Sequence, residues 1–131
     1  MTTFVLATNG VHVSSTLCDY LDERIEAEDT VHAVNSQRGG DATSAEAVRD
    51  GEEALNVVSA RLGTVVTVET HQFIRGNTPA ADVLEFADEV DADELVIGVR
   101  ERSPTGKALF GSVAQKLLLN TDRPVVVVPR E

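Results

Sequence analysis

The residues best suited to chemistry lie in one stretch, Gly98 to Ser112, which connects an apolar run to a helical pattern. The apolar run, Leu95 to Ile97, is interrupted at Gly98, and the helical pattern begins at Gly111. The stretch therefore joins a predicted buried strand to a predicted helix N-terminus, a junction where α/β proteins commonly hold phosphate groups. The twelve residues between Gly98 and Gly111 exceed the usual ~2–6 of such a connection, and long connections tend to be functional.

Basic residues concentrate in this stretch of an otherwise acidic chain. They are Arg100, Arg102 and Lys107, with Glu101 as the acidic residue beside them, a local balance of +2 where the whole chain carries −11. Ordinary surface charge is one interpretation, but this concentration favours attraction of an anion over the ~8–10 Å that salt leaves unscreened. The acidic remainder argues against nucleic acid as a partner, because basic groups supply most of that affinity.

Apolar runs and helical patterns alternate along the chain, which predicts a parallel sheet covered on both faces. Strands are expected at Phe4–Ala7, Val31–Asn35, Thr64–Thr70, Leu95–Ile97 and Val125–Val128. Helices are expected after N-caps at Ser14 or Ser15, Thr43, Thr78 and Ser112. Thr43 with Glu46 and Ser112 with Gln115 have the spacing of a capping box. Val66 and Val68 alternate with polar residues, which places the third strand at an edge of the sheet.

Size and composition fit one domain, residues 1–131, that can bury a single core. The lone Cys18 rules out an internal disulfide and fits a reducing compartment. The first residues contain neither a basic segment nor a long apolar run, so no signal peptide or membrane span is expected. The prediction is a cytoplasmic protein without a membrane partner.

The glycine spacing resembles that of the universal stress protein family. Gly98, Glu101 and Gly111-Ser112 are similar to that family's Gly-x-x-Gly, nine residues, Gly-Ser motif, with Glu101 in place of the second glycine. This motif marks the subgroup that binds ATP. Phe4 to Gly10 resembles the family's first strand and turn, and Gly76 to Ala80 its glycine turn before the third helix, so the likeness covers nearly the whole chain.

The resemblance implies a three-layer αβα sandwich around a five-stranded parallel sheet in the order 3-2-1-4-5. In that order, the crevice between the first and fourth strands receives both Thr8-Asn9-Gly10 and the long loop. The order also leaves the fifth strand at an edge with no protecting charge or bulge. The family covers this edge by homodimerisation, here through Val125, Val126, Val127 and Val128.

Many members of the family hold ATP or AMP in this crevice, and the matching positions carry over to this chain. The nucleotide-binding residues implied in this way are Ala7, Thr8, Asn9, Ala33, Gly98, Arg100, Glu101, Gly111, Ser112 and Val113. The residues up to Ala33 would hold adenine and ribose, and the others would lie around the phosphates. Glu101 would place a negative charge there, which Arg100 and Arg102 offset or which helps to hold Mg²⁺. Asn9 replaces the family's aspartate and keeps a neutral acceptor for a ribose hydroxyl.

The sequence thus predicts a regulatory protein of the stress response that acts by occupancy of its nucleotide site. The bound nucleotide would order the long loop and so alter a surface that an unknown protein partner recognises. The alternative is a nucleotide-free dimeric interaction protein whose pocket Glu101 has disabled, with Ser112 serving only as a helix cap. No catalytic residue is predicted, although slow ATP hydrolysis with His12 as base stays open. His12, His32 and His71 lie in separate segments without ligand spacing, so no metal site is expected.

Overall fold

The computed structural model describes residues 1–100 and 111–130, and in this part of the chain strands and helices alternate as expected. The strands are β1 (Thr3–Ala7), β2 (Thr30–Gln37), β3 (Thr67–Ile74), β4 (Glu94–Arg100) and β5 (Val125–Arg130). The helices are α1 (Val11–Asp22), α2 (Ala45–Leu62), α3 (Pro79–Glu89) and α4 (Ser112–Asn120), with a short 3₁₀ turn at Gly40–Ala42. All strand pairs are parallel and the order is β3-β2-β1-β4-β5, which confirms the predicted sheet.

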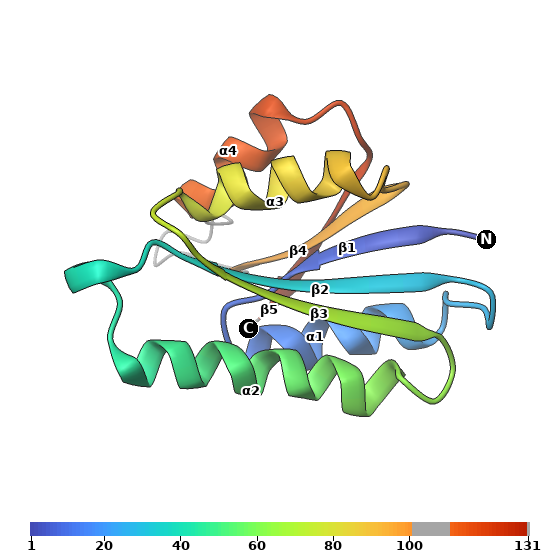
Figure 1. Ribbon diagram of the computed structural model, residues 1–131. Coiled ribbons are helices and arrows are strands. Elements are labelled where there is room, and N and C mark those ends of the chain that lie inside the picture. Colours follow the sequence, from blue (N-terminus) through green and yellow to red (C-terminus); the bar gives the residue numbers. More distant parts are fainter. Residues whose placement is uncertain (101–110, 131) are drawn as a thin grey trace.

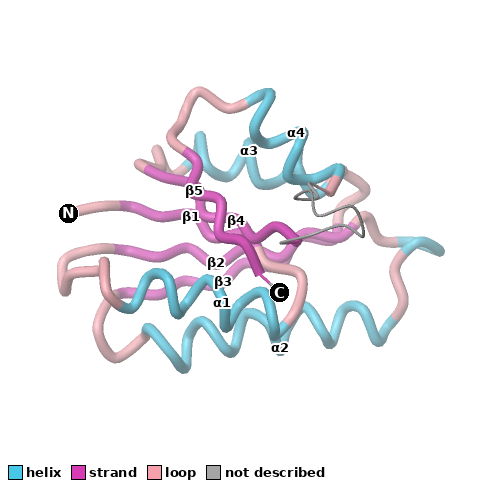
Figure 2. The backbone as a smooth tube through the Cα atoms, turned by 180° about the vertical axis from the view of Figure 1, so that it is seen from behind, coloured by secondary structure: helices cyan, strands magenta, loops and turns pink. Residues whose placement is uncertain are grey.

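Two helices cover each face of the sheet, so the fold is the three-layer sandwich that was expected (Figure 1). Helices α1 and α2 pack on one face and α3 and α4 on the other, and Figure 2 shows the same layers from behind. Strand β1 is buried on both faces, because Phe4 and Leu6 point towards α1 and α2 while Val5 points towards the opposite helices. Among the described residues, no helix combines the length and the hydropathy needed to cross a membrane.

Two predicted helix starts near the N-terminal half are wrong. Helix α1 begins at Val11 with Gly10 as its N-cap, so Ser14 lies inside the helix, where it is fully buried. Helix α2 is capped by Ser44, whose hydroxyl accepts a hydrogen bond from the Ala47 amide at 3.0 Å. Thr43 instead accepts from the Gly39 amide, because the preceding turn folds back onto it.

Of the two C-terminal helix starts, the start of α3 is as predicted and the start of α4 is not. Helix α3 begins as predicted, with Pro79 in its first turn and Thr78 accepting a hydrogen bond from the Ala81 amide. Helix α4 has Gly111 as its N-cap, so Ser112 is the first helical residue and the predicted capping box with Gln115 is wrong.

Pairing in the sheet extends four strands, β2, β3, β4 and β5, beyond their predicted ends. Strand β4 continues through Gly98 to Arg100, because β5 pairs with it over this whole length. Strand β2 continues to Gln37 and β3 to Ile74, which pair with each other. At its other end, strand β3 begins three residues later than predicted, where its pairing with β2 begins. Its place at the edge of the sheet is confirmed.

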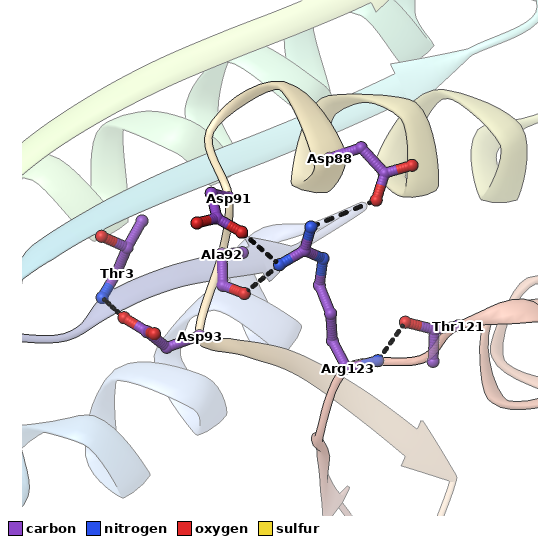
Figure 3. Close-up of polar contacts among 7 residues, drawn as sticks. All are labelled: Thr3, Asp88, Asp91, Ala92, Asp93, Thr121 and Arg123. Carbon is purple, nitrogen blue, oxygen red and sulfur yellow. Dashed lines mark hydrogen bonds and ion pairs between the residues drawn. The ribbon is translucent and has the colours of Figure 1, made fainter.

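A cluster around Arg123 fixes the end of the sheet where β1 and β4 begin (Figure 3). The guanidinium donates to the Ala92 carbonyl and pairs with Asp91 and Asp88 at 3.3 and 3.2 Å. Two further bonds of this region join the Arg123 amide to Thr121 and the Thr3 amide to Asp93. These contacts tie the connection between α4 and β5 to the end of α3, which anchors α4 at its C-terminal end.

Candidate functional site

A cavity of about 660 Å³ opens at the carboxyl ends of β1 and β4, between the sheet and helices α3 and α4. This volume lies within the range of roughly 300–1,000 Å³ that is typical of small-molecule sites. Seven of the predicted site residues line it: Ala7, Thr8, Asn9, Gly98, Gly111, Ser112 and Val113. The first three and the last three come from segments about a hundred residues apart in the chain, which the parallel sheet brings to one edge.

Among the described site residues, Ala33 does not line the cavity, and two other predicted residues cannot be placed there. Ala33 is fully buried in the core under α1 and α2, and its neighbour Val34 lines the cavity instead. Side chains alternate between the faces of a strand, so a shift of one residue changes the face. The backbone of Arg100 ends β4, while its side chain and all of Glu101, Arg102 and Lys107 lie outside the described residues.

The two glycines of the predicted motif differ in their surroundings. A Cβ atom on Gly98 would lie 3.2 Å from Cγ1 of Val13, so this glycine allows α1 to pack closely against β4. At Gly111 the backbone φ is −66°, which any residue adopts, and no described atom lies within 4 Å of the Cβ position. Neither strain nor packing by the described residues requires a glycine at position 111.

Two helices begin beside the cavity, and neither carries a side-chain cap. Gly10 and Gly111 are the N-caps of α1 and α4, and neither helix has an acidic residue in its first turn. The other two helices, α2 and α3, are capped by Ser44 and Thr78 and carry an acidic residue there. The first amides of a helix have no partner within it and attract negative charge. At the cavity, the start of α4 thus favours an anion, whereas Gly10 to His12 at the start of α1 line a neighbouring pocket with Asp50 and Glu53.

Buried hydrogen bonds hold the turn after β1 in place. The Thr8 amide donates to the Val34 carbonyl, and the Thr8 carbonyl accepts from Nδ2 of Asn35 at 3.0 Å. Oγ of Ser14 donates to the Ala54 carbonyl at 2.7 Å, which uses its single proton. The Thr8 hydroxyl lies 2.7 Å from the Ser14 hydroxyl, and the two share a hydrogen bond. These bonds link the cavity wall to both α1 and α2.

The carboxamide of Asn35 is itself held against α2. Its oxygen accepts from Nε2 of Gln37 at 2.9 Å and from Nε2 of Gln72 at 3.2 Å. Gly51, in the middle of α2, lies directly against this group, since a Cβ atom there would be 2.2 Å from Asn35 Oδ1. Sequence reasoning missed this contact, and its only signal was a glycine inside a helical pattern.

An ionised carboxylate supports the wall that α3 contributes. Asp82 is completely buried and accepts hydrogen bonds from Ser36, from Nε of Arg75 at 2.9 Å and from Asn77 at 3.0 Å. Burial alone would raise the pKa of Asp82, but the hydrogen bonds from these three residues outweigh it and hold the pKa below its usual value. Ser36 lines the cavity, so this charge fixes the end of β2 relative to α3.

The profile of the universal stress protein family matches residues 7–129 of this chain. The chain belongs to the universal stress protein family. A universal stress protein of Mycolicibacterium smegmatis is 40% identical over 108 residues, which cover 81% of each protein. A universal stress protein from Archaeoglobus fulgidus has a TM-score of 0.81 at 33% identity. Another from that organism, solved in complex with dAMP, has a TM-score of 0.72 at 27% identity; each comparison covers 98% of both chains.

Away from this cavity, the structure overturns the expectation that the three histidines are scattered. Nδ1 of His32, on β2, lies 3.2 Å from Nε2 of His71, on β3. The two residues are 39 positions apart, and only the pairing of the two strands brings them together. His12 lies separately, in a smaller pocket that Asp50 and Glu53 also line.

Proposed function

We propose that this universal stress protein binds an adenine nucleotide, ATP or AMP, in the cavity between β1 and β4. The observation that carries the proposal is the uncapped start of α4 facing the turn after β1 across one cavity of nucleotide-compatible size. The A. fulgidus relative in complex with dAMP supports the choice of an adenine nucleotide. The match of Gly98, Gly111 and Ser112 to the family's ATP motif supports the subgroup in which Glu101 replaces a glycine.

The lining divides into an apolar and a polar part that fit the two halves of a nucleotide. Val34 and Val83 provide apolar contacts for adenine, and Asn9 offers an exposed amide group to a ribose hydroxyl. The amides of Ser112 and Val113, at the start of α4, point their partial positive charge at the phosphates. The described lining offers hydroxyl, carboxamide and backbone groups that suit ligand binding, and we propose a regulatory protein that acts by occupancy, with no catalytic role for these described residues.

The first test is to denature freshly purified protein, analyse the supernatant for nucleotide, and titrate the stripped protein with AMP and with Mg-ATP. We expect one nucleotide per chain in at least one of these measurements. Inorganic phosphate measured in the same ATP samples reports any slow hydrolysis. If neither bound nucleotide nor a heat of binding is found at millimolar ligand, the proposal is wrong and the nucleotide-free interaction protein is the better description.

We also propose that the protein forms a homodimer through β5 and functions in the cytoplasm, where an unknown protein partner responds to the bound state. Strand β5 ends the sheet, and Val125 to Val128 are half-buried. The Leu95 amide donates to the Pro124 carbonyl at 2.9 Å. Backbone groups of alternate residues in a strand point to opposite sides, so Val126 points towards β4 while Val125 and Val127 point their backbone groups to the outer edge.

Replacing Val127 with proline is expected to convert the dimer to monomers, because it removes one edge donor from each copy and keeps the ladder with β4. At a two-fold interface the change acts twice, and the lost hydrogen bonds and unpaired acceptors together cost about 2–4 kcal/mol of association free energy. Sedimentation equilibrium measures the change, with circular dichroism to confirm folding. Val127→Ala, which keeps the amide, is the matched control and should remain dimeric. A dimer of Val127→Pro as tight as the wild type would contradict pairing through β5.

A further inference from the structure

Three side chains that can bind a metal converge on the edge strand β3 and its neighbour β2, away from the proposed nucleotide cavity. His32 on β2 lies opposite Glu69 on β3, and His71 follows two residues after Glu69. All three side chains point to the α3 face, since residues two apart share a face of a strand. Their potential ligand atoms lie within 4.8 Å of one another. The site is thus built by the register of two strands.

The distance between the two imidazoles fits a shared metal ion. Nδ1 of His32 and Nε2 of His71 are 3.2 Å apart. Two nitrogens bound to a tetrahedral zinc ion at ~2.0–2.1 Å are separated by about 3.3 Å, so the spacing of these two nitrogens matches that of two zinc ligands. The carboxylate of Glu69 is exposed and can turn towards the same point.

The rings are held in place by packing that does not use their facing nitrogens. Phe86 of α3 contacts both, with ring centroids 5.3 Å from His32 and 4.4 Å from His71. Phe73 stacks on His71 from the same strand. His32 is 7% exposed, whereas His71 and Glu69 are reached by solvent. The arrangement combines two fixed ligands with one adjustable ligand and an open side.

We propose that His32, Glu69 and His71 form a binding site for a divalent transition-metal ion, and that zinc is the ion it fits best. Two imidazoles and one carboxylate are a common set of three protein ligands for zinc, with water in the fourth position. Mg²⁺ and Ca²⁺ prefer oxygen ligands and do not suit this set. Burial also lowers the pKa of both histidines, and His32 further lowers that of His71, which favours the neutral imidazoles that bind metals.

The bound ion would join β3 to β2 at the edge of the sheet. Strand β3 has one neighbour only, so a bond from Glu69 and His71 to His32 restrains the strand that is easiest to detach. The water position on the ion would face solvent from the side of Glu69 and His71. This site would act on the stability of the fold independently of nucleotide, because none of its ligands lines the nucleotide cavity.

The test is equilibrium dialysis of untagged, chelator-treated protein against Zn²⁺ without nucleotide, with the metal content measured by mass spectrometry. We expect one zinc ion per chain and a rise in Tm of roughly 10 °C at a zinc concentration of about 100 times Kd. His71→Ala should weaken binding at least about 100-fold, since even outer-shell changes cost 10–100-fold. Glu69→Gln, an exposed change that leaves the fold intact, should weaken it about 10-fold or more.

His12→Ala is the matched control, because it removes the one histidine outside the cluster and should leave zinc binding unchanged. Mg²⁺ should neither bind nor raise Tm, and Co²⁺ should give the strong visible absorption of a tetrahedral site. The proposal is overturned if wild type and His71→Ala bind zinc equally, if His12→Ala abolishes binding, or if wild type binds none. In the last case the close histidine pair is a hydrogen bond between neutral rings.

Discussion

Replacing Gly51 with alanine is expected to lower the free energy of unfolding by about 3 kcal/mol, although the same change in an exposed helix gains about 1 kcal/mol. The new Cβ atom would lie 2.2 Å from Asn35 Oδ1 and 2.8 Å from Gln37 Nε2. These groups cannot turn away freely, because Asn35 is 1% exposed and bonded through both ends of its carboxamide. Helix α2 must shift, or buried polar groups lose their partners, at ~1–3 kcal/mol for each group.

Chemical denaturation of Gly51→Ala measures this loss, and a double-mutant cycle with Asn35→Ala tests its cause. Asn35→Ala alone should destabilise the protein, since the Thr8 carbonyl and Gln72 lose their partner. In that background the contact with Asn35 is gone and the approach to Gln37 Nε2 at 2.8 Å remains, so Gly51→Ala should cost clearly less than in the wild type. Equal costs of Gly51→Ala in both backgrounds would show that contact with Asn35 is not responsible. Nucleotide affinity should fall with Gly51→Ala as well, because Asn35 holds the Thr8 turn of the cavity.

Replacing Ser112 with aspartate is expected to weaken nucleotide binding about 30-fold while leaving the protein as stable or slightly more stable. Ser112 is exposed and is the first residue of α4. A carboxylate at a helix start stabilises the helix by ~0.3–1 kcal/mol. The same charge beside bound phosphates repels them, and about 2 kcal/mol of repulsion corresponds to the 30-fold loss.

The matched control is Ser112→Asn, which has nearly the same shape as the aspartate variant but no charge. Calorimetric titration with AMP and with Mg-ATP compares the affinities, and thermal unfolding without nucleotide compares the stabilities. The repulsion should be larger for Mg-ATP if more phosphates lie at α4. Affinities that are equal for the aspartate and asparagine variants would place the phosphates elsewhere. An affinity loss accompanied by unfolding would contradict the predicted opposite effects on binding and stability.

Much of the fold followed from local patterns in the sequence. Apolar runs such as Phe4–Ala7 and Leu95–Ile97 are typical of strands buried between helices, and their alternation with helical patterns predicts a parallel sheet. The alternation around Val68 placed β3 at an edge correctly. Element ends were less predictable, because pairing with a neighbour decides where a strand stops. Strand β4 passes through Gly98 since β5 continues beside it.

The location of the cavity was likewise available from the sequence, because strand order and glycine spacing together bring Thr8 and Gly111 to one edge. The face of a strand residue was not, and this is why Val34 rather than Ala33 lines the cavity.

The sequence by itself determined the alternation of strands and helices, because this depends on periodicity along the chain. The family resemblance supplied the strand order and, with it, the two segments that meet at the cavity. Only the tertiary structure decided which side chains touch across strands and helices. The contact of Gly51 with Asn35 and the pair formed by His32 and His71 depend on register and packing between distant segments. No local pattern encodes such contacts, since each partner alone is compatible with many neighbours.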